Sequence, residues 1–216
     1  MAVLNVKPSK GKNYGYGAND TRIVETYIRY ITRTRSSYGG DQYPPAYVGS
    51  LGFKPFATVE ELVEGFFLTQ SIYRVHTGIR ARHEWISFKD GETVDLNGIQ
   101  RVAEIAYWFA RWYYNQGYQV VFAIHTDTEH LHIHYVINSV NFITGRKYHS
   151  NTAVLNNERA YLNDIICWLT GKCESAVELS EYTDCFDGLM DENLLSMQRY
   201  MPVVIFPYDG SPQIVY

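Results

Sequence analysis

Two neighbouring apolar segments constrain the fold of this chain more than any other feature. Residues 118–125 (YQVVFAIH) and 131–140 (LHIHYVINSV) are rich in β-branched and aromatic residues, and only a short polar stretch separates them. Segments of this composition form buried strands, and a short connection lets them pair side by side as antiparallel strands. The sequence therefore predicts an antiparallel hairpin within a larger sheet.

Histidines are concentrated in this hairpin, which holds four of the seven in the chain. Alternate residues of a strand share a face, so His130, His132 and His134 are expected to point the same way, with His125 brought across from them. Buried imidazoles are costly unless they are hydrated, paired or bound to a metal. We therefore predict that His125, His132 and His134 bind a divalent ion through neutral nitrogens. His130 is an additional candidate ligand, and Asp127 in the turn is placed to orient an imidazole.

The rest of the chain alternates between predicted strands and helices. Thr58 and Glu61 form a capping box that begins one helix, and Gly171 ends another. The expected strands are Val3–Val6, Tyr47–Leu51, Arg82–Phe88, Met201–Phe206 and a short one at Arg146–His149, and the expected helices are 23–33, 59–73, 97–115 and 157–169. A turn is expected at 89–91, and helix and loop at 174–200.

The distribution of charge limits how this chain can contact nucleic acid. The net charge is −4, but residues 174–216 hold eight acidic residues and one basic residue, which leaves 18 basic and 15 acidic residues in 1–173. The first 35 residues carry seven basic and two acidic side chains. A basic body and arm can hold phosphates locally, but binding to DNA by charge alone is excluded.

Composition also bears on location. The chain has no run of 18 apolar residues free of charge, and no apolar segment follows the lysines of residues 1–17. We therefore expect neither a transmembrane helix nor a secretory signal, and predict a cytoplasmic protein. The three cysteines, Cys167, Cys173 and Cys185, are unevenly spaced and predict neither a disulfide framework nor a zinc site.

The histidine segment resembles a known motif. VFAIHTDTEHLHIHYVIN (residues 121–138) is similar to the third motif of conjugative and mobilisation relaxases, which belong to the His-hydrophobic-His endonucleases. The following NSVNFITGRKYH (138–149) is similar to its continuation in relaxases of Gram-positive mobile elements. HEWISFKDGE (83–92) and TYIRYITRT (26–34) resemble the second and first motifs. The resemblance covers roughly residues 1–170.

This resemblance implies a fold, a reaction and partners. It implies an α+β fold, a central antiparallel sheet with flanking helices, and a metal-dependent enzyme using Mn²⁺ or Mg²⁺, with Zn²⁺ or Ni²⁺ as alternatives. A tyrosine would nick single-stranded DNA at an origin of transfer, site- and strand-specifically, hold the 5′ end as a phosphotyrosine, and rejoin it later. The expected partners are origin DNA, accessory relaxosome proteins and a type IV coupling protein of a plasmid or integrative conjugative element.

The resemblance also implies roles for individual residues. The first motif carries its nucleophile before Ile-Thr, which favours Tyr30, but Tyr27 lies on the same helical face and remains the alternative. Asp127 acting through a histidine is the candidate base. The second motif assigns Ser87 to the DNA backbone, although an ordinary strand-end serine fits the same position. His83 on that strand is interpreted as structural.

Several basic side chains near these motifs are candidate phosphate ligands. The predicted DNA-binding residues are Arg29, Arg33, Arg35 and Lys147, for which a solvated basic face or a simple turn lysine is the alternative interpretation. Asn138 is expected to fix the local backbone or a histidine.

Domain organisation and alternative functions complete the predictions. Residues 1–172 are expected to form the nicking domain, and 173–216 an acidic C-terminal extension packed on it or regulating it. The open alternatives are a relaxase-like module that binds origin DNA without nicking, a metal-dependent phosphodiesterase that does not use tyrosine, and a non-haem iron oxygenase using His125 and Asp127.

Overall fold

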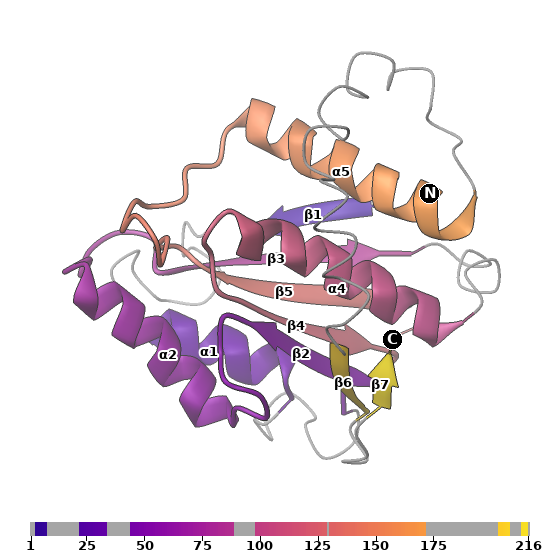
Figure 1. The fold of residues 1–216 in the computed structure, drawn as a ribbon, viewed down its shortest axis with the longest axis horizontal. Helices are drawn as coiled ribbons and strands as arrows, with labels where there is room; N and C mark the ends of the chain where they lie inside the picture. The colour runs from indigo at the N-terminus through magenta and orange to yellow at the C-terminus, as the bar shows by residue number, and fades with distance from the viewer. Residues whose placement is uncertain are drawn as a thin grey trace.

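The predicted hairpin lies in the middle of an antiparallel sheet. A computed structural model describes residues 3–7, 22–33, 44–88, 98–128, 130–171, 203–207 and 213–215. Its seven-stranded sheet has the order β1-β3-β5-β4-β2-β6-β7, and each neighbouring pair is antiparallel (Figure 1). The strands are β1 Val3–Lys7, β2 Tyr47–Leu51, β3 Ala81–Ser87, β4 Val120–His125, β5 His132–Asn138, β6 Val203–Pro207 and β7 Gln213–Val215.

Helices cover both faces of this sheet, which confirms the expected α+β class. Those in the described part of the chain are α1 Arg22–Ile31, α2 Val59–Ile72, α4 Ile99–Asn115 and α5 Thr152–Thr170. Helices α4 and α5 pack with Ile133 and Tyr135 of β5, whereas α1 and α2 pack with Val136 (Figure 1). Because alternate residues of a strand face opposite sides, His132 and His134 share the α1 face with Val136.

Local capping explains three of the helix boundaries. The Thr58 and Glu61 capping box is present at the start of α2, as predicted. Helix α5 begins at Thr152, earlier than predicted, because the Asn151 side chain accepts a hydrogen bond from the Val154 N–H and caps it. Gly171 ends this helix with φ 70°, as expected.

Three further predictions concern a short strand, the cysteines and membrane-spanning helices. The short strand expected at Arg146–His149 is wrong, since that segment contributes only an isolated bridge between Lys147 and Val140. The expectation for the cysteines is also wrong, because Cys167 is disulfide-bonded. None of the described helices combines the length and apolar character that crossing a membrane requires.

Part of the predicted C-terminal extension joins the main sheet. Strand β6 pairs with β2, placing Pro207 opposite Tyr47 and Phe206 opposite Val48. The helix and loop predicted at 174–200 and the turn at 89–91 lie outside the described residues. The boundary after residue 172 remains a prediction.

Candidate metal and tyrosine site

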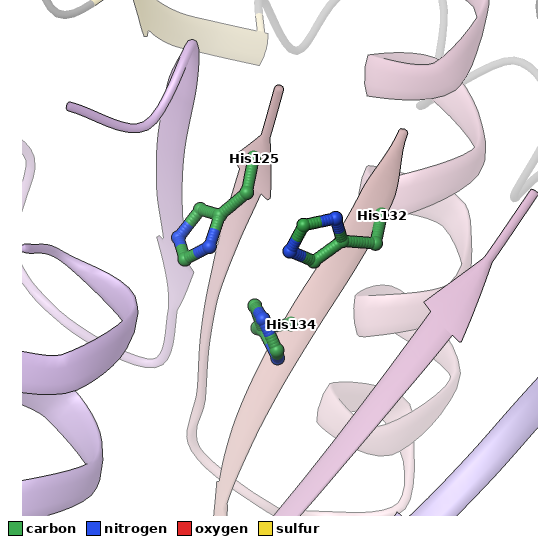
Figure 2. Close-up of side chains that lie close together, drawn as sticks. All are labelled: His125, His132 and His134. Atoms are coloured by element: carbon green, nitrogen blue, oxygen red, sulfur yellow. The ribbon is translucent and has the colours of Figure 1, made fainter. Parts of the chain in front are cut away.

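Three histidines converge at one end of the central hairpin. His125 ends β4 and His132 begins β5, where the two are directly opposite each other, and His134 follows two residues along β5. Their imidazoles point toward one another (Figure 2), and one nitrogen from each lies within 4.8 Å of the others. We call His125, His132 and His134 the histidine cluster.

The fourth histidine of the segment lies outside this cluster. Strand β5 begins only at His132, so His130 is not part of the alternating pattern and its side chain is exposed. The His130 backbone carbonyl accepts a hydrogen bond from His132 Nδ1 at 2.9 Å. This bond fixes the proton on Nδ1 and leaves the Nε2 lone pair of His132 available to a ligand.

The other two histidines are also held from outside the cluster. His125 Nε2 donates to the Ile31 carbonyl at 2.6 Å, and its Nδ1 accepts from Arg33 Nη2 at 3.1 Å. His134 Nδ1 lies 3.0 Å from Nε2 of His83, and its buried Nε2 has no hydrogen-bond partner within the described residues. A buried nitrogen without a partner is uncommon in a folded protein and calls for an explanation.

Burial keeps these imidazoles in the form that binds metal. Desolvation lowers the pKa of His125 to about 4, despite the opposing hydrogen bond to Ile31. Desolvation is also the main cause that lowers the pKa of His134, and repulsion from His83 and the other two cluster histidines adds to it. Both rings are therefore neutral near pH 7, with lone pairs that are not protonated.

The cluster fits a divalent ion. Nitrogen ligands about 2.1 Å from a tetrahedral ion lie about 3.4 Å from one another, and the three nitrogens here are within 4.8 Å. Small side-chain rotations close that gap, and a bound ion would satisfy the His134 Nε2 that otherwise has no partner. Release of His125 Nδ1 by Arg33 would complete the set of donors.

A buried ion pair borders the cluster. Arg33 Nη2 donates to Asp127 Oδ2 at 2.7 Å, and Asp127 Oδ1 lies 3.7 Å from His132 Nε2. Arg33 follows α1 directly, has a left-handed φ of 54°, and is only 9% exposed. Asp127 thus lies near a histidine, and its predicted role in orienting one stays a prediction, while Arg33 lies within the site rather than on a solvated basic face.

The two candidate tyrosines both pack beside histidines of the site and differ in burial. The half-buried Tyr30 ring is centred 5.5 Å from that of His134, and the Arg33 guanidinium lies 5.0 Å from the centre of the Tyr30 ring. Tyr27 is 5% exposed, and its ring is centred 5.1 Å from that of His83. Tyr30 therefore lies beside the cluster, whereas Tyr27 packs against the neighbouring histidine.

The remaining predicted site residues are scattered. Ser87 is directly opposite His132 in the pairing of β3 with β5. Arg29 forms ion pairs with Glu25 at 2.8 Å and Glu60 at 3.0 Å, which neutralise its charge.

Two other predicted residues, Lys147 and Asn138, lie toward the end of the hairpin that is distant from His132. Lys147 donates to the Thr77 carbonyl and bridges Val140, beyond the end of β5 that is distant from His132. Asn138 donates to Gln119 Oε1 and accepts from the Val140 N–H, so it fixes the backbone rather than a histidine. Arg35 lies outside the described residues.

The sequence alone did not predict that His83 lies against the histidine cluster. This side chain is 4% exposed, bonds to His134, and has ring contacts with both Tyr27 and Tyr30. Its alternation with Trp85 and Ser87 was the available signal. The pairing register that puts Trp85 opposite His134, and hence His83 diagonal to it, was needed to use that signal.

Comparisons with known proteins bear on this geometry. The family described as "Relaxase: MobA/VirD2-like, nuclease domain" matches residues 30–166, a range that begins at Tyr30 and contains all three cluster histidines. A Staphylococcus aureus protein named "Protein rlx" is 33% identical over 134 residues, covering 61% of this chain and 41% of the relative. Another S. aureus "Protein rlx" is 35% identical over 105 residues, covering 47% and 30%. The chain thus spans less than half the length of these relatives.

Proposed function

Given that this chain belongs to the MobA/VirD2-like relaxase family, through the nuclease domain, we propose that it nicks and rejoins one DNA strand at an origin of transfer. The substrate is single-stranded DNA of a plasmid or integrative conjugative element, and the cut 5′ end stays joined to a tyrosine. The proposed setting is the cytoplasm, with relaxosome proteins and a coupling protein as partners.

One observation carries this proposal. The Tyr30 ring lies 5.5 Å from His134, at a cluster of three histidines whose nitrogens converge within 4.8 Å. A nucleophile beside a group of neutral metal ligands is the arrangement that metal-assisted phosphoryl transfer requires. Tyr27 is more deeply buried and packs on His83, so Tyr30 is the proposed nucleophile.

The proposed reaction exchanges one phosphoester bond for another. The Tyr30 Oη forms a bond to phosphorus while the bond from phosphorus to the 3′ oxygen breaks. The phenol loses its proton, and the leaving oxygen takes one up as a 3′-OH. A free phenol titrates near pH 10, so this proton must leave as the new bond to phosphorus forms.

His125, His132 and His134 are the proposed holders of a divalent ion, with Asp127 beside them and paired to Arg33. When bound, the ion supplies polarisation of the phosphate and neutralises charge that develops on its oxygens. Nitrogen donors suit Mn²⁺ better than Mg²⁺, and they also accept Zn²⁺ or Ni²⁺. Ser87, opposite His132, is the proposed contact to the DNA backbone.

The proposal also covers how the chain divides into a domain and an extension. Residues 1–172 are proposed as the nicking domain, and 173–216 as an extension that packs on this domain or regulates it. The pairing of β6 with β2 supports packing.

A denaturing gel tests the proposal. The protein is incubated with Mn²⁺ and labelled single-stranded DNA from the region next to its gene, beside the variants Tyr30→Phe and Tyr27→Phe. The control is Tyr114→Phe, which alters a partly exposed tyrosine on α4. We expect a protein–DNA adduct that disappears only in Tyr30→Phe.

Other outcomes identify the alternatives. Loss of the adduct only in Tyr27→Phe would transfer the nucleophilic role to that residue. Cleavage without an adduct would indicate a metal-dependent phosphodiesterase that does not use tyrosine. Binding to the same DNA without cleavage would indicate a DNA-binding module.

A further inference from the structure

A fourth histidine adjoins the cluster without belonging to it. His83 lies on β3, one strand away from the hairpin, and its Nε2 is 3.0 Å from Nδ1 of His134. The two ring centroids are 5.0 Å apart. This contact is buried, since His83 is 4% exposed and His134 is 6% exposed.

The direction of this hydrogen bond follows from the cluster. His134 Nε2 is the nitrogen that is buried without a hydrogen-bond partner. If Nε2 offers its lone pair to an ion, the single proton of the neutral ring is on Nδ1, and Nδ1 donates to His83. His83 Nε2 is then the acceptor that fixes both the tautomer and the rotation of the His134 ring.

We infer that His83 is a positioning residue, which holds His134 Nε2 toward the metal site through its hydrogen bond to Nδ1. This inference rests on the proposed metal-dependent function and assigns a role to a residue outside the three ligands. The other two ligands are held by backbone carbonyls, of Ile31 for His125 and of His130 for His132. Of the three, His134 is the one held by a side chain without a backbone hydrogen bond among the described residues, so its orientation is open to substitution.

The ring contacts of His83 extend its influence to helix α1. Its ring is centred 5.1 Å from that of Tyr27 and 5.7 Å from that of Tyr30. One side chain thus contacts a metal ligand and the helix that carries the proposed nucleophile. The interpretation of His83 as purely structural predicts an effect on stability, whereas a positioning role predicts an effect on metal affinity.

Paired substitutions separate these roles. His83→Leu removes the acceptor at nearly constant volume, while His83→Gln restores an acceptor oxygen near the position of Nε2. The full-length protein is titrated with Mn²⁺ in a calorimeter, without DNA, and its urea unfolding is measured without metal. His76→Leu, which removes an exposed histidine, is the control.

We expect His83→Leu to weaken Mn²⁺ binding by about 10- to 100-fold, the usual cost of losing a partner of a metal-bound histidine. His83→Gln is expected to remain within about threefold of the unaltered protein, and adduct formation by His83→Leu to recover as Mn²⁺ is raised. Equal affinity in the Leu and Gln variants would overturn the inference. Absence of Mn²⁺ binding in the unaltered protein would instead overturn the proposed metal site.

Discussion

Buried ionisable side chains gather on both faces of the sheet, but the two groups are built differently. The α1 face carries the histidine cluster. The α4 face carries Arg82 and Glu84 of β3, Tyr113 of α4, Tyr148, and Glu158 of α5, which we call the carboxylate cluster. In it, Tyr113 donates to Glu84 at 2.5 Å, Tyr148 donates to Glu158, and Arg82 pairs with both carboxylates.

The two clusters differ in where their polar atoms point. Members of the carboxylate cluster bond to one another, so its charges are compensated within the group. Each histidine has one nitrogen bonded to a group outside the cluster. The second nitrogens of His132 and His134 face a common point, whereas that of His125 is bonded to Arg33, which would have to release it to a ligand. Atoms without a hydrogen-bond partner occur in both clusters, but among the described residues only the histidine cluster gathers three metal-binding side chains at one point.

Perturbed pKa values alone would not separate these clusters. Burial raises the pKa of Glu84 to about 7, just as burial lowers that of His125 to about 4. Both are shifts of the kind that marks functional sites, and structural networks produce them too. The useful criterion is the direction of the lone pairs, together with a nearby half-buried nucleophile such as Tyr30.

The largest expected change in stability comes from removing the cation of the carboxylate cluster. In Arg82→Met, Glu84 and Glu158 remain buried without a counter-charge, which costs about 3–5 kcal/mol in free energy of unfolding. Urea unfolding at pH 7 without metal measures this loss. Arg101→Met, at an exposed pair with Glu104, is the control and should change stability by less than about 1 kcal/mol. If Arg82→Met also abolished Mn²⁺ binding by the folded protein, the two clusters would not be independent.

A smaller effect is expected from the pH dependence of the same cluster. Glu84 has a pKa near 7 when folded and 4.5 as an ordinary side chain, mainly because of desolvation and then repulsion by Glu158. Between these pH values the native state holds a proton that the unfolded state has released, so the free energy of unfolding falls as pH rises. The contribution is at most about 3 kcal/mol.

Glu84→Gln tests this pH dependence because it cannot release that proton. Its free energy of unfolding, measured by urea between pH 4.5 and 7.5, should fall less steeply than that of the unaltered protein. Glu104→Gln controls for the loss of one acidic side chain. Parallel curves for Glu84→Gln and the unaltered protein would show that Glu84 does not take up a proton on folding.

The sequence predicts the fold well where local signals decide it. Alternation and β-branched residues placed β2, β3, β4 and β5 within two residues, and the Thr58 capping box placed the start of α2. The order of the strands did not follow from these signals, because it depends on contacts between segments far apart in the chain. The pairing of β6 with β2 is such a contact.

The candidate site shows the same contrast between residues that a local pattern groups and residues that long-range contacts bring in. The three cluster histidines lie within one hairpin, so the period of a strand was enough to group them. His130 was grouped with them by extending the alternation one residue before the expected strand at 131–140, whereas β5 begins only at His132. The positions of Arg33 and His83 depend on how α1 and β3 meet the hairpin, and no local pattern reports that geometry.

The smallest change in stability, and the sharpest contrast with Arg82→Met, is expected for His132→Ala. This ring is half-buried, and its hydrogen bonds to described residues are at Nδ1, so the metal-free protein should change by about 1 kcal/mol or less. A ligand at 100 times its Kd stabilises the folded state by about 2.7 kcal/mol, and the unaltered protein should show this gain with Mn²⁺. His132→Ala should lose most of the gain and form no adduct.

His130→Ala is the control, because it removes an exposed neighbouring ring and keeps the carbonyl that holds His132. It should retain both the Mn²⁺ gain and the adduct. An unchanged Mn²⁺ gain in His132→Ala would exclude this residue as a ligand, whereas loss of the gain in His130→Ala would add His130 to the site.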